Sequence, residues 1–381
     1  MRNVSLSALA AAVLVVFLVT TISGGNEGPI YWERARELLQ KQRQGASLTQ
    51  EEREYLERAR RERQRHSGRR GESGRVKRGD SIGLTPITQM GEGLYKGQTG
   101  GLYGGGMDIP PEAHQKAVAK ELANIRPLDA DGRPSTGGKI VLMAIGMSNT
   151  KMEFSAFTDL AGRDPNKSSN VVLVNAAIGG MDVIAWAKSR ATQWGTAWEG
   201  AERRLKEAGV TAAQVQVVWL KQAKMGPAGW GKFPAHARKL ADGMAVILNM
   251  AKERYPNLRV AYLSSRIYAG YATTPLNPEP YAYESAFSVR WLIEEQIKGE
   301  PNLNYDAQKG QVKSPLLLWG PYLWADGVEP RKADGLVWKR QDLAGDGTHP
   351  SKSGRRKVAE MLLKFFKTDP NAHGWFLKKP V

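Results

Sequence analysis

The chain has 381 residues, no cysteine, and a formal net charge of +17 from 55 Lys and Arg against 38 Asp and Glu. The lack of cysteine excludes disulfides, thiolate metal sites and a lipid-modified cysteine anchor. The positive charge is uneven, because residues 58–78 contain ten Lys or Arg against only Glu62 and Glu72.

Residues 1–23 combine a short cationic start with an almost wholly apolar run from Leu6 to Ile22. This pattern predicts an export signal. A run of about 17 apolar residues can also span a bilayer, so an uncleaved N-terminal membrane anchor is an open alternative. In either case we expect an exported protein that is periplasmic, extracellular or membrane-anchored.

Residues 24–80 form a basic helical and linker segment in our interpretation. Helical periodicity covers residues 31–44 and 49–64, and Thr49 with Glu52 has the spacing of a capping box. The positive run at 58–78 favours contact with an anionic surface or membrane. Behind an export signal, nucleic acid is an unlikely partner.

Residues 81–138 are rich in glycine and are predicted to be a lead-in loop followed by a helix over 111–125. No strand and helix bracket the glycines as a phosphate-binding loop requires, which argues against a nucleotide site. We expect the loop to lie over the next domain, with Tyr95 and Tyr103 available to stack on sugars.

Residues 139–381 alternate between strand-like and helical patterns, which predicts parallel pairing and helices on both faces of one sheet. The expected fold is α/β, a three-layer α/β/α sandwich of flavodoxin-like type. The predicted strands are 139–146, 171–178, 215–220, 258–264 and 315–319, and the predicted helices are 151–161, 197–208, 235–253, 285–298 and 353–367. Ligands of such sheets bind beyond the carboxyl ends of the strands, where Ser148, Gly179, Gly180, Gln222 and Arg266 would emerge.

Ser148 follows the apolar run of residues 140–146 and precedes a helix, for which Thr150 and Glu153 have capping-box spacing. A serine at a helix N-terminus is well placed to attack a carbonyl, because the free N–H groups there favour an anion. The commoner alternative is that Ser148, Asn149 and Thr150 serve only as turn and cap residues.

The segment from Asp346 to Pro350 places an Asp three residues before His349. Such an Asp can orient the imidazole of a His that accepts a serine proton. Asp342 is a weaker candidate for the same role, since it lies seven residues away. The other histidines occur near helix starts, in the basic segment or near the C-terminus.

These residues resemble the SGNH (GDSL-type) hydrolases, and within them the carbohydrate-esterase branch of sialate O-acetylesterase-like proteins. Residues 146–149 (Gly-Met-Ser-Asn) are similar to the nucleophile block, residues 177–180 with Trp186 to the glycine block, and residues 346–350 to the terminal Asp-x-x-His block. Two positions depart from the pattern. Met147 replaces the usual Asp or Gln, and the third block reads Val-Trp-Leu-Lys-Gln-Ala at 218–223, where either Gln222 or Lys221 could project.

The resemblance implies a serine esterase that removes ester groups, O-acetyl in particular, from an extracytoplasmic carbohydrate. Ser148 would be the nucleophile, His349 the base and Asp346 its orienting acid, with no metal or organic cofactor. The oxyanion would be held by the N–H groups of Ser148 and Gly180 and by the Gln222 amide. The residues expected to contact the substrate are Asn149, Gly179, Arg266, Tyr283, Glu284 and Tyr322.

The sequence leaves other functions open. Met147 and the altered third block are compatible with a non-catalytic carbohydrate-binding module on a degenerate SGNH scaffold. A lipid esterase is a third possibility, although it would need a larger apolar rim. Aromatic residues at 268–283 and 319–324 predict a rim suited to sugar rings, although such residues more often belong to the core.

Overall fold

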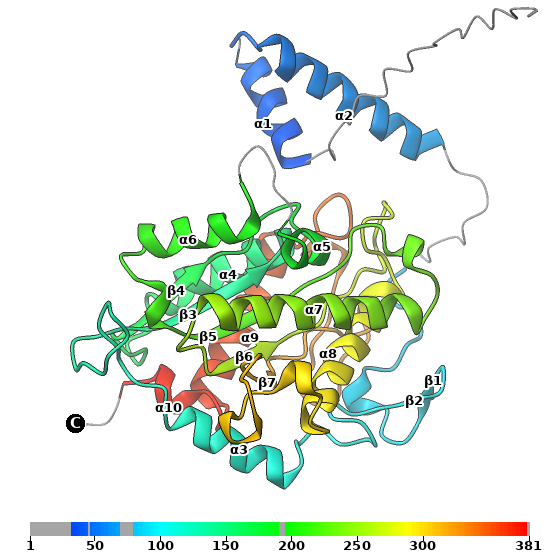
Figure 1. The fold of residues 1–381 in the computed structure, drawn as a ribbon. Helices are drawn as coiled ribbons and strands as arrows, with labels where there is room; N and C mark the ends of the chain where they lie inside the picture. Colours follow the sequence, from blue (N-terminus) through cyan, green and yellow to red (C-terminus); the bar gives the residue numbers. More distant parts are fainter. Residues whose placement is uncertain (1–31, 45, 69–78, 190–194, 379–381) are drawn as a thin grey trace, which may run out of the picture. The chain divides into compact units, whose positions relative to one another are not determined.

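The computed structural model describes residues 32–44, 46–68, 79–189 and 195–378 (Figure 1). The chain divides into two compact units, residues 1–69 and 70–381. The predicted export segment at 1–23 lies outside the described residues, as does the 69–78 part of the basic run. Within the described ranges, no helix is both long and apolar enough to cross a membrane.

The first unit contains two helices, α1 (Trp32–Arg43) and α2 (Gln50–Gly68). The capping box predicted before the second helix is confirmed, because the Thr49 hydroxyl accepts from the Glu52 N–H and the Glu52 carboxylate accepts from the Thr49 N–H. The two helices share a small apolar core, made of Ala35, Leu38, Leu48, Tyr55, Leu56 and Ala59.

The second unit is built on a parallel five-stranded sheet with the order β4-β3-β5-β6-β7. The strands are β3 (Ile140–Gly146), β4 (Val171–Asn175), β5 (Val215–Lys221), β6 (Val260–Leu263) and β7 (Leu316–Trp319). Numbered along the chain this is the order 2-1-3-4-5 of flavodoxin-like folds. The predicted α/β fold is therefore confirmed.

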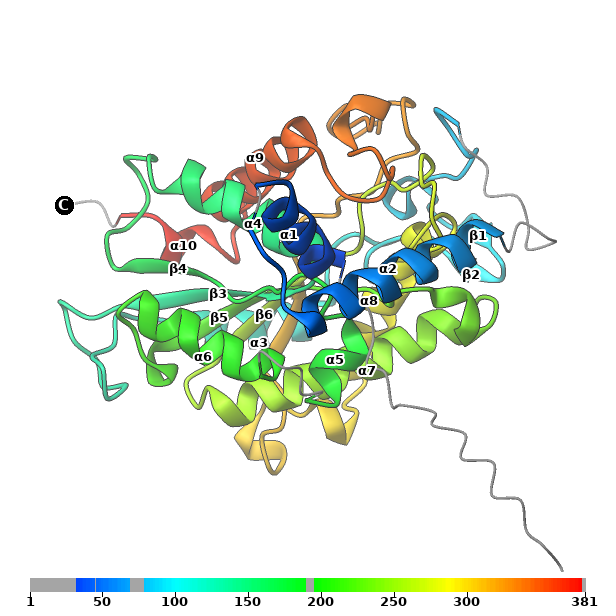
Figure 2. The ribbon, with the colours of Figure 1, turned by 90° about the horizontal axis from the view of Figure 1, so that it is seen from above.

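Helices cover both faces of the sheet (Figure 2). The helices of the sandwich are α4 (Ser148–Ala161), α5 (Val183–Ala187), α6 (Ala197–Glu207), α7 (Ala235–Arg254), α8 (Tyr281–Ile297), α9 (Lys352–Thr368) and α10 (His373–Phe376). α4 packs with α9 on one face, and α5, α6 and α7 lie on the other. The chain changes direction after β4, so right-handed crossovers place α4 and α7 on opposite faces.

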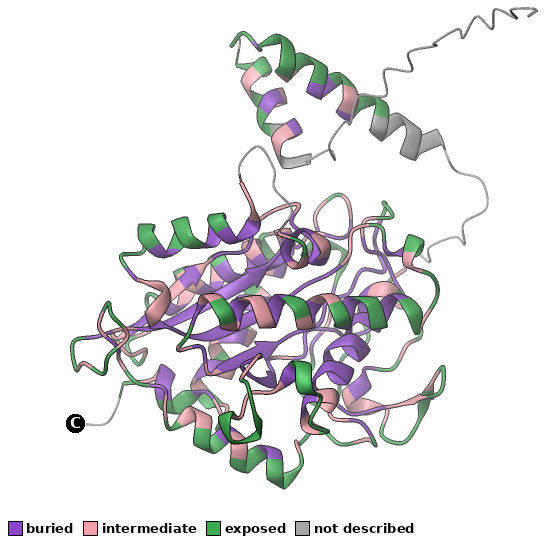
Figure 3. Cartoon of the chain, in the orientation of Figure 1, coloured by how far each residue is buried: buried purple, intermediate pink, exposed green. Residues whose placement is uncertain are grey.

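The sheet is the centre of the core (Figure 3). Every residue of β3, β5, β6 and β7 is buried, which explains why these strands are largely apolar and do not alternate. Gln216 and Lys221 are the polar residues of β5, and each is 1% exposed.

The lead-in segment packs within the same compact unit as the sheet. It contains a short antiparallel hairpin, β1 (Leu94–Tyr95) with β2 (Gln98–Thr99), and helix α3 (Glu112–Leu122). The hairpin turn needs a left-handed backbone, which Lys96 and Gly97 adopt with φ of 48° and 82°. Short 3₁₀ helices complete the elements, at Ile87–Gln89, Ala212–Gln214, Pro227–Trp230, Pro301–Leu303, Ala307–Lys309 and Arg340–Asp342.

The capping box predicted from Thr150 and Glu153 is wrong. Helix α4 begins at Ser148, with Met147 as an extended N-cap residue. The Thr150 hydroxyl donates to the Lys221 carbonyl, and the Glu153 carboxylate pairs with the Lys221 ammonium. Both side chains therefore connect α4 to β5, a long-range contact that local spacing does not reveal.

Candidate active site

Ser148 is the first residue of α4, directly beyond the carboxyl end of β3. Its side chain is half-buried, and its backbone N–H belongs to the first turn, where helical N–H groups have no partner within the helix. Gly146 permits this tight exit from the strand, because a Cβ there would collide with the Lys221 carbonyl and the Thr150 hydroxyl. The sequence thus presents a hydroxyl at a positive helix end.

His349 lies beside this serine, although the two are 201 residues apart in the chain. The Ser148 Oγ is 2.8 Å from His349 Nε2, and His349 Nδ1 is 2.5 Å from Asp346 Oδ2. The three side chains form one continuous hydrogen-bonded chain. The His349 side chain is 16% exposed, so it remains within reach of solvent and of a small substrate.

The turn that carries His349 is held by the carboxylate of Asp346. Asp346 Oδ1 accepts from the backbone N–H groups of Thr348 and His349, both at 3.0 Å. Gly347 has φ of +66°, and a Cβ there would meet the Tyr271 carbonyl. A glycine is therefore required between the acid and the histidine.

The electrostatics of Asp346 favour its ionised form. Burial by itself raises the pKa of this carboxyl, but the hydrogen bonds from the His349 ring and from the backbone of His349 and Thr348 outweigh it and hold the pKa well below its ordinary value. A carboxylate that stays charged can compensate an imidazolium at the His349 position.

Asp342, the alternative acid, has other partners. Its carboxylate accepts from the Lys357 ammonium at 2.5 Å, from the Lys339 N–H at 2.9 Å and from the Ser353 hydroxyl at 2.9 Å. It stabilises the start of α9 and the preceding 3₁₀ turn, while Asp346 is the carboxylate that contacts the histidine.

The glycine block lies against the end of β3. Gly180 has φ of +79°, and the Gly146 carbonyl accepts from the Ile178 N–H at 3.1 Å and from the Trp186 indole at 3.2 Å. Gly179 and Gly180 therefore form a tight turn tied to the strand that delivers Ser148. This geometry is compatible with a backbone N–H donor near the serine.

In the third block, at residues 218–223, the side chains of Lys221 and Gln222 have different environments. Lys221 points into the protein and pairs with Glu153, so it does not supply a donor to the serine. Gln222 follows directly and is 2% exposed, and its amide nitrogen has no hydrogen-bond partner. A buried amide donor without a partner is unusual and suits a site where a ligand oxygen arrives.

Asn149 and Arg266 are buried beside this region. The Asn149 amide donates to the Thr348 carbonyl at 3.0 Å and so supports the His349 turn from α4. Arg266 follows β6, is 2% exposed, and leaves its Nε and Nη2 without partners. Burial lowers the pKa of Arg266, while the carboxylates of Glu153, Glu279 and Asp346 oppose this shift.

The structure does not bring Tyr283, Tyr322 and Glu284 to the serine in this way, because their polar atoms bind elsewhere. The Tyr283 hydroxyl donates to the Thr85 carbonyl, and the Tyr322 hydroxyl accepts from the Ile87 N–H. Glu284 accepts from Tyr95 and Lys96 at 2.7 Å and contacts His236 at 2.6 Å. These contacts anchor the lead-in segment and favour a structural role for all three residues.

The aromatic rim is largely part of the core. Tyr281 is partly exposed, and the other side chains concerned are buried, namely Tyr268, Tyr271, Tyr283, Trp319, Tyr322 and Trp324. Tyr95 packs against Tyr283 and Phe287 with ring centroids 4.9 and 5.6 Å apart, so it faces inward. The aromatic content of these segments reflects packing of the lead-in segment on α8.

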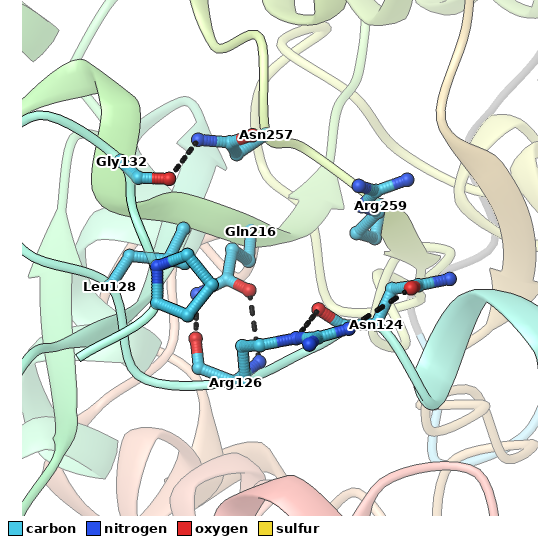
Figure 4. A pocket seen from close by; sticks show the side chains of 8 residues that line it. Asn124, Arg126, Leu128, Gly132, Gln216, Asn257 and Arg259 are labelled. Atoms are coloured by element: carbon cyan, nitrogen blue, oxygen red, sulfur yellow. Dashed lines mark hydrogen bonds between the residues drawn. The ribbon is translucent and has the colours of Figure 1, made fainter. Parts of the chain in front are cut away.

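A hollow of about 260 Å³ lies at the opposite end of the sheet (Figure 4). Gln216 at the start of β5, Arg259 before β6 and Arg126 line it. Gln216 and Arg126 bind each other and Arg126 also binds Asn124, so their groups are largely satisfied. Among the described residues, no group of three or more His, Cys, Asp or Glu could hold a metal ion.

Sequence reasoning missed the buried Glu153–Lys221 pair. Its signal was present, because Lys221 is a charged residue at the end of a largely apolar strand and Glu153 falls among the apolar positions of α4. A charge in such a position needs a partner, but the partner could not be identified before the register of β3 and β5 was known.

Fold and site together define a parallel α/β protein with a Ser-His-Asp arrangement at the carboxyl edge of the sheet. No protein-family model matches the chain, and no curated protein matches it. Among solved structures, the chain is similar to "BT4096 a gut microbial diltiazem-metabolizing enzyme" at 13% identity and a TM-score of 0.31. The match covers 62% of this chain and 48% of that one, a distant likeness that assigns no activity here.

Proposed function

We propose that the protein is a serine esterase of the SGNH type that hydrolyses small esters, O-acetyl groups in particular, on an extracytoplasmic carbohydrate. One observation carries the proposal. Ser148, His349 and Asp346 form a hydrogen-bonded chain at 2.8 and 2.5 Å, at the carboxyl edge of the sheet near the point between β3 and β5 where the strand order reverses. Ligands of open α/β sheets bind at that switch point.

In the first half of the reaction, Ser148 Oγ attacks the ester carbonyl carbon while His349 Nε2 accepts the hydroxyl proton. Asp346 holds the ring through Nδ1 and compensates the imidazolium charge. The oxyanion is held by the N–H groups of Ser148 and Gly180 and by the Gln222 amide. Collapse of the tetrahedral intermediate breaks the ester bond, and the alcohol leaves with the proton from His349.

In the second half, His349 accepts a proton from water, which attacks the acyl-serine carbon. A second tetrahedral intermediate collapses, the acid leaves, and the proton returns to Ser148 Oγ. Every atom in this cycle comes from the ester, the water and the three side chains. The half-buried position of Ser148 suits a short acyl group such as acetyl.

The test is hydrolysis of p-nitrophenyl acetate, butyrate and decanoate, and of an acetylated sugar, by the full chain. We expect turnover on the acetyl esters, and a loss of at least about a thousandfold in Ser148→Ala and His349→Ala, since triad members act as a unit. His373→Ala is the matched control, because this exposed histidine lies in α10 and its ring contacts Asp369.

Other outcomes separate the alternatives. Rates that increase with acyl length would favour a lipid esterase. Absence of turnover on any ester, together with sugar binding, would favour a non-catalytic carbohydrate-binding module. Equal activity in wild type and both triad variants would exclude Ser148 as the nucleophile.

The proposal includes an exported protein whose basic residues 58–78 contact an anionic surface or membrane. It is supported by the sequence pattern of residues 1–23 and by the charge of the run. Cell fractionation tests the location, and cosedimentation with anionic vesicles at low and high salt tests the contact. Recovery of the chain in the cytoplasm would contradict the first part.

A further inference from the structure

A buried ion pair lies beneath the proposed nucleophile. Glu153 of α4 is 0% exposed and Lys221 of β5 is 1% exposed, and their side chains bind each other. Burial raises the pKa of Glu153 and lowers that of Lys221 to about 8, and each partner opposes the shift of the other. Isolated charges in such positions are costly, so a pair is retained only with good geometry.

This pair ties the helix of the serine to the strand of the predicted amide donor. Glu153 lies five residues after Ser148 on α4, and Lys221 lies directly before Gln222. A second contact acts in parallel, because the Thr150 hydroxyl donates to the Lys221 carbonyl at 2.7 Å. Gly146 is the strand partner of Lys221, so β3, α4 and β5 meet at this residue.

The contacts of Lys221 constrain Gln222 more than the hydrogen bonds of Gln222 itself do. The Gln222 side-chain oxygen accepts only from the adjacent Ala223 N–H, at 3.3 Å, and its nitrogen has no partner. An amide without its own anchors depends on its neighbours for orientation. Lys221, held at its carbonyl and at its ammonium, is the neighbour that supplies that constraint.

We propose that Glu153 and Lys221 are positioning residues that hold the Gln222 amide in register with Ser148. The inference rests on the proposed esterase function and deepens it. A pair that served only to fill the core would affect folding, whereas a positioning pair also determines how much Gln222 contributes to turnover.

The test is a double-mutant cycle in the full chain between the pair and Gln222. In wild type, we expect Gln222→Ala to lower kcat about a hundred- to a thousandfold. In Glu153→Met/Lys221→Met, we expect the apolar replacement of both charges to preserve folding. There we expect kcat to be at least tenfold below wild type with KM within threefold, and Gln222→Ala to add less than a further tenfold loss.

The single variants separate folding from positioning. Lys221→Met and Glu153→Gln each leave one buried charge unpaired, and we expect Tm to fall by roughly 10 °C in each and to recover in the double variant. Lys367→Met/Asp164→Asn is the matched control, since this ion pair at 2.6 Å lies at the far end of α4. Its kcat should stay within twofold of wild type.

Full wild-type kcat in the double variant, or losses that multiply without coupling to Gln222, would overturn the proposal. If the double variant fails to fold, Thr150→Val replaces it, because this isosteric change removes only the bond to the Lys221 carbonyl. We expect Thr150→Val to show the same coupling to Gln222→Ala, and independent losses would again overturn the inference. Inactive wild type would contradict the esterase function itself, a result distinct from any of these.

Discussion

The Tyr271 hydroxyl donates a hydrogen bond of 2.6 Å to Asp80, the second described residue after the basic run. The backbone of the same loop supports the turn at 346–349, because the Tyr271 carbonyl lies against Gly347 and the Thr273 N–H donates to the Asp346 carbonyl at 2.9 Å. Asp80 itself is held through its carbonyl by the Val328 N–H. The loop at 268–273 is thus held between Asp80 and the turn of Asp346, the proposed acid.

We expect Asp80→Ala to lower kcat about three- to tenfold with little change in KM, because loss of one partly buried hydrogen bond costs about 1 kcal/mol and loosens the Asp346 turn. A chain that begins at residue 81 should show at least this loss, because it also lacks the Asp80 carbonyl that accepts from the Val328 N–H. Asp306→Ala is the control, since Asp306 only caps a short 3₁₀ helix.

The double variant Asp80→Ala/Tyr271→Phe provides the internal check. It removes both partners, so we expect it to lose less activity than the sum of the single changes. Unchanged kcat in Asp80→Ala, measured with p-nitrophenyl acetate, would show that the turn does not depend on this contact.

Asp346→Asn should distinguish the two candidate acids. An amide at this position cannot accept from His349 Nδ1–H and from two backbone N–H groups as a carboxylate does, and loss of a triad acid lowers kcat by about 10⁴. Asp342→Asn should lower the free energy of unfolding by about 1–3 kcal/mol through Lys357, with kcat within a few-fold of wild type. Initial rates and chemical denaturation of both variants measure this, and a reversed result would assign the role to Asp342.

Local sequence patterns predicted the strand before Ser148 and the turn at 346–350 because each is determined within a few residues. Gly146 and Gly347 mark the two tight turns, and the apolar runs mark strands buried on both faces. The parallel pairing of the strands followed from the alternation of strands and helices. These features needed no knowledge of distant contacts, and the fold class followed from them.

The remaining features depended on contacts distant in sequence. Thr150 and Glu153 match a capping box locally, but Lys221, about 70 residues away, binds both. The local sequence around Tyr283 and Tyr322 fits a sugar-binding rim as well as a position beneath another segment of the chain. In the structure the lead-in segment lies over both residues. Thr85 binds the Tyr283 hydroxyl from 198 residues away, and Ile87 binds the Tyr322 hydroxyl from 235 residues away.

Gly347→Ala should impair both folding and turnover. Its φ of +66° is in the left-handed region, and the added Cβ would collide with the Tyr271 carbonyl. We expect the free energy of unfolding to fall by at least about 1–3 kcal/mol, because strain of this kind has that cost, and His349 to be displaced from Ser148. Gly345→Ala is the matched control, since a Cβ at that nearby glycine meets nothing within 4 Å.

Differential scanning calorimetry and ester hydrolysis measure the two effects of the glycine changes. A Gly347→Ala protein with the Tm and the kcat of wild type would mean that the turn has another accessible conformation. Loss of activity in Gly345→Ala would mean that the turn tolerates no change, and that the collision at Gly347 is not the cause.

The raised pKa of the buried Glu279 carboxyl predicts that the free energy of unfolding depends on pH. Glu279 is 7% exposed, and burial raises its pKa from 4.5 to about 7, although bonds from Trp324, Ala269 and Tyr283 and the charge of Arg266 oppose the shift. Because the folded pKa exceeds the unfolded one, the folded state binds more protons between these values. The contribution of Glu279 to stability is therefore fully present below pH 4.5 and is lost as pH rises through about 7.

Urea denaturation of wild type and Glu279→Gln between pH 5 and 8 isolates this group, because the other titrations cancel in the difference. A pKa that rises from 4.5 to about 7 corresponds to about 3 kcal/mol. We expect the free energy of unfolding of wild type, relative to Glu279→Gln, to decrease toward pH 8 by up to that amount. A relative increase toward pH 8 would mean that the three donors and Arg266 stabilise the ionised carboxylate more than burial opposes it, so Glu279 would act as a permanent counter-ion to Arg266.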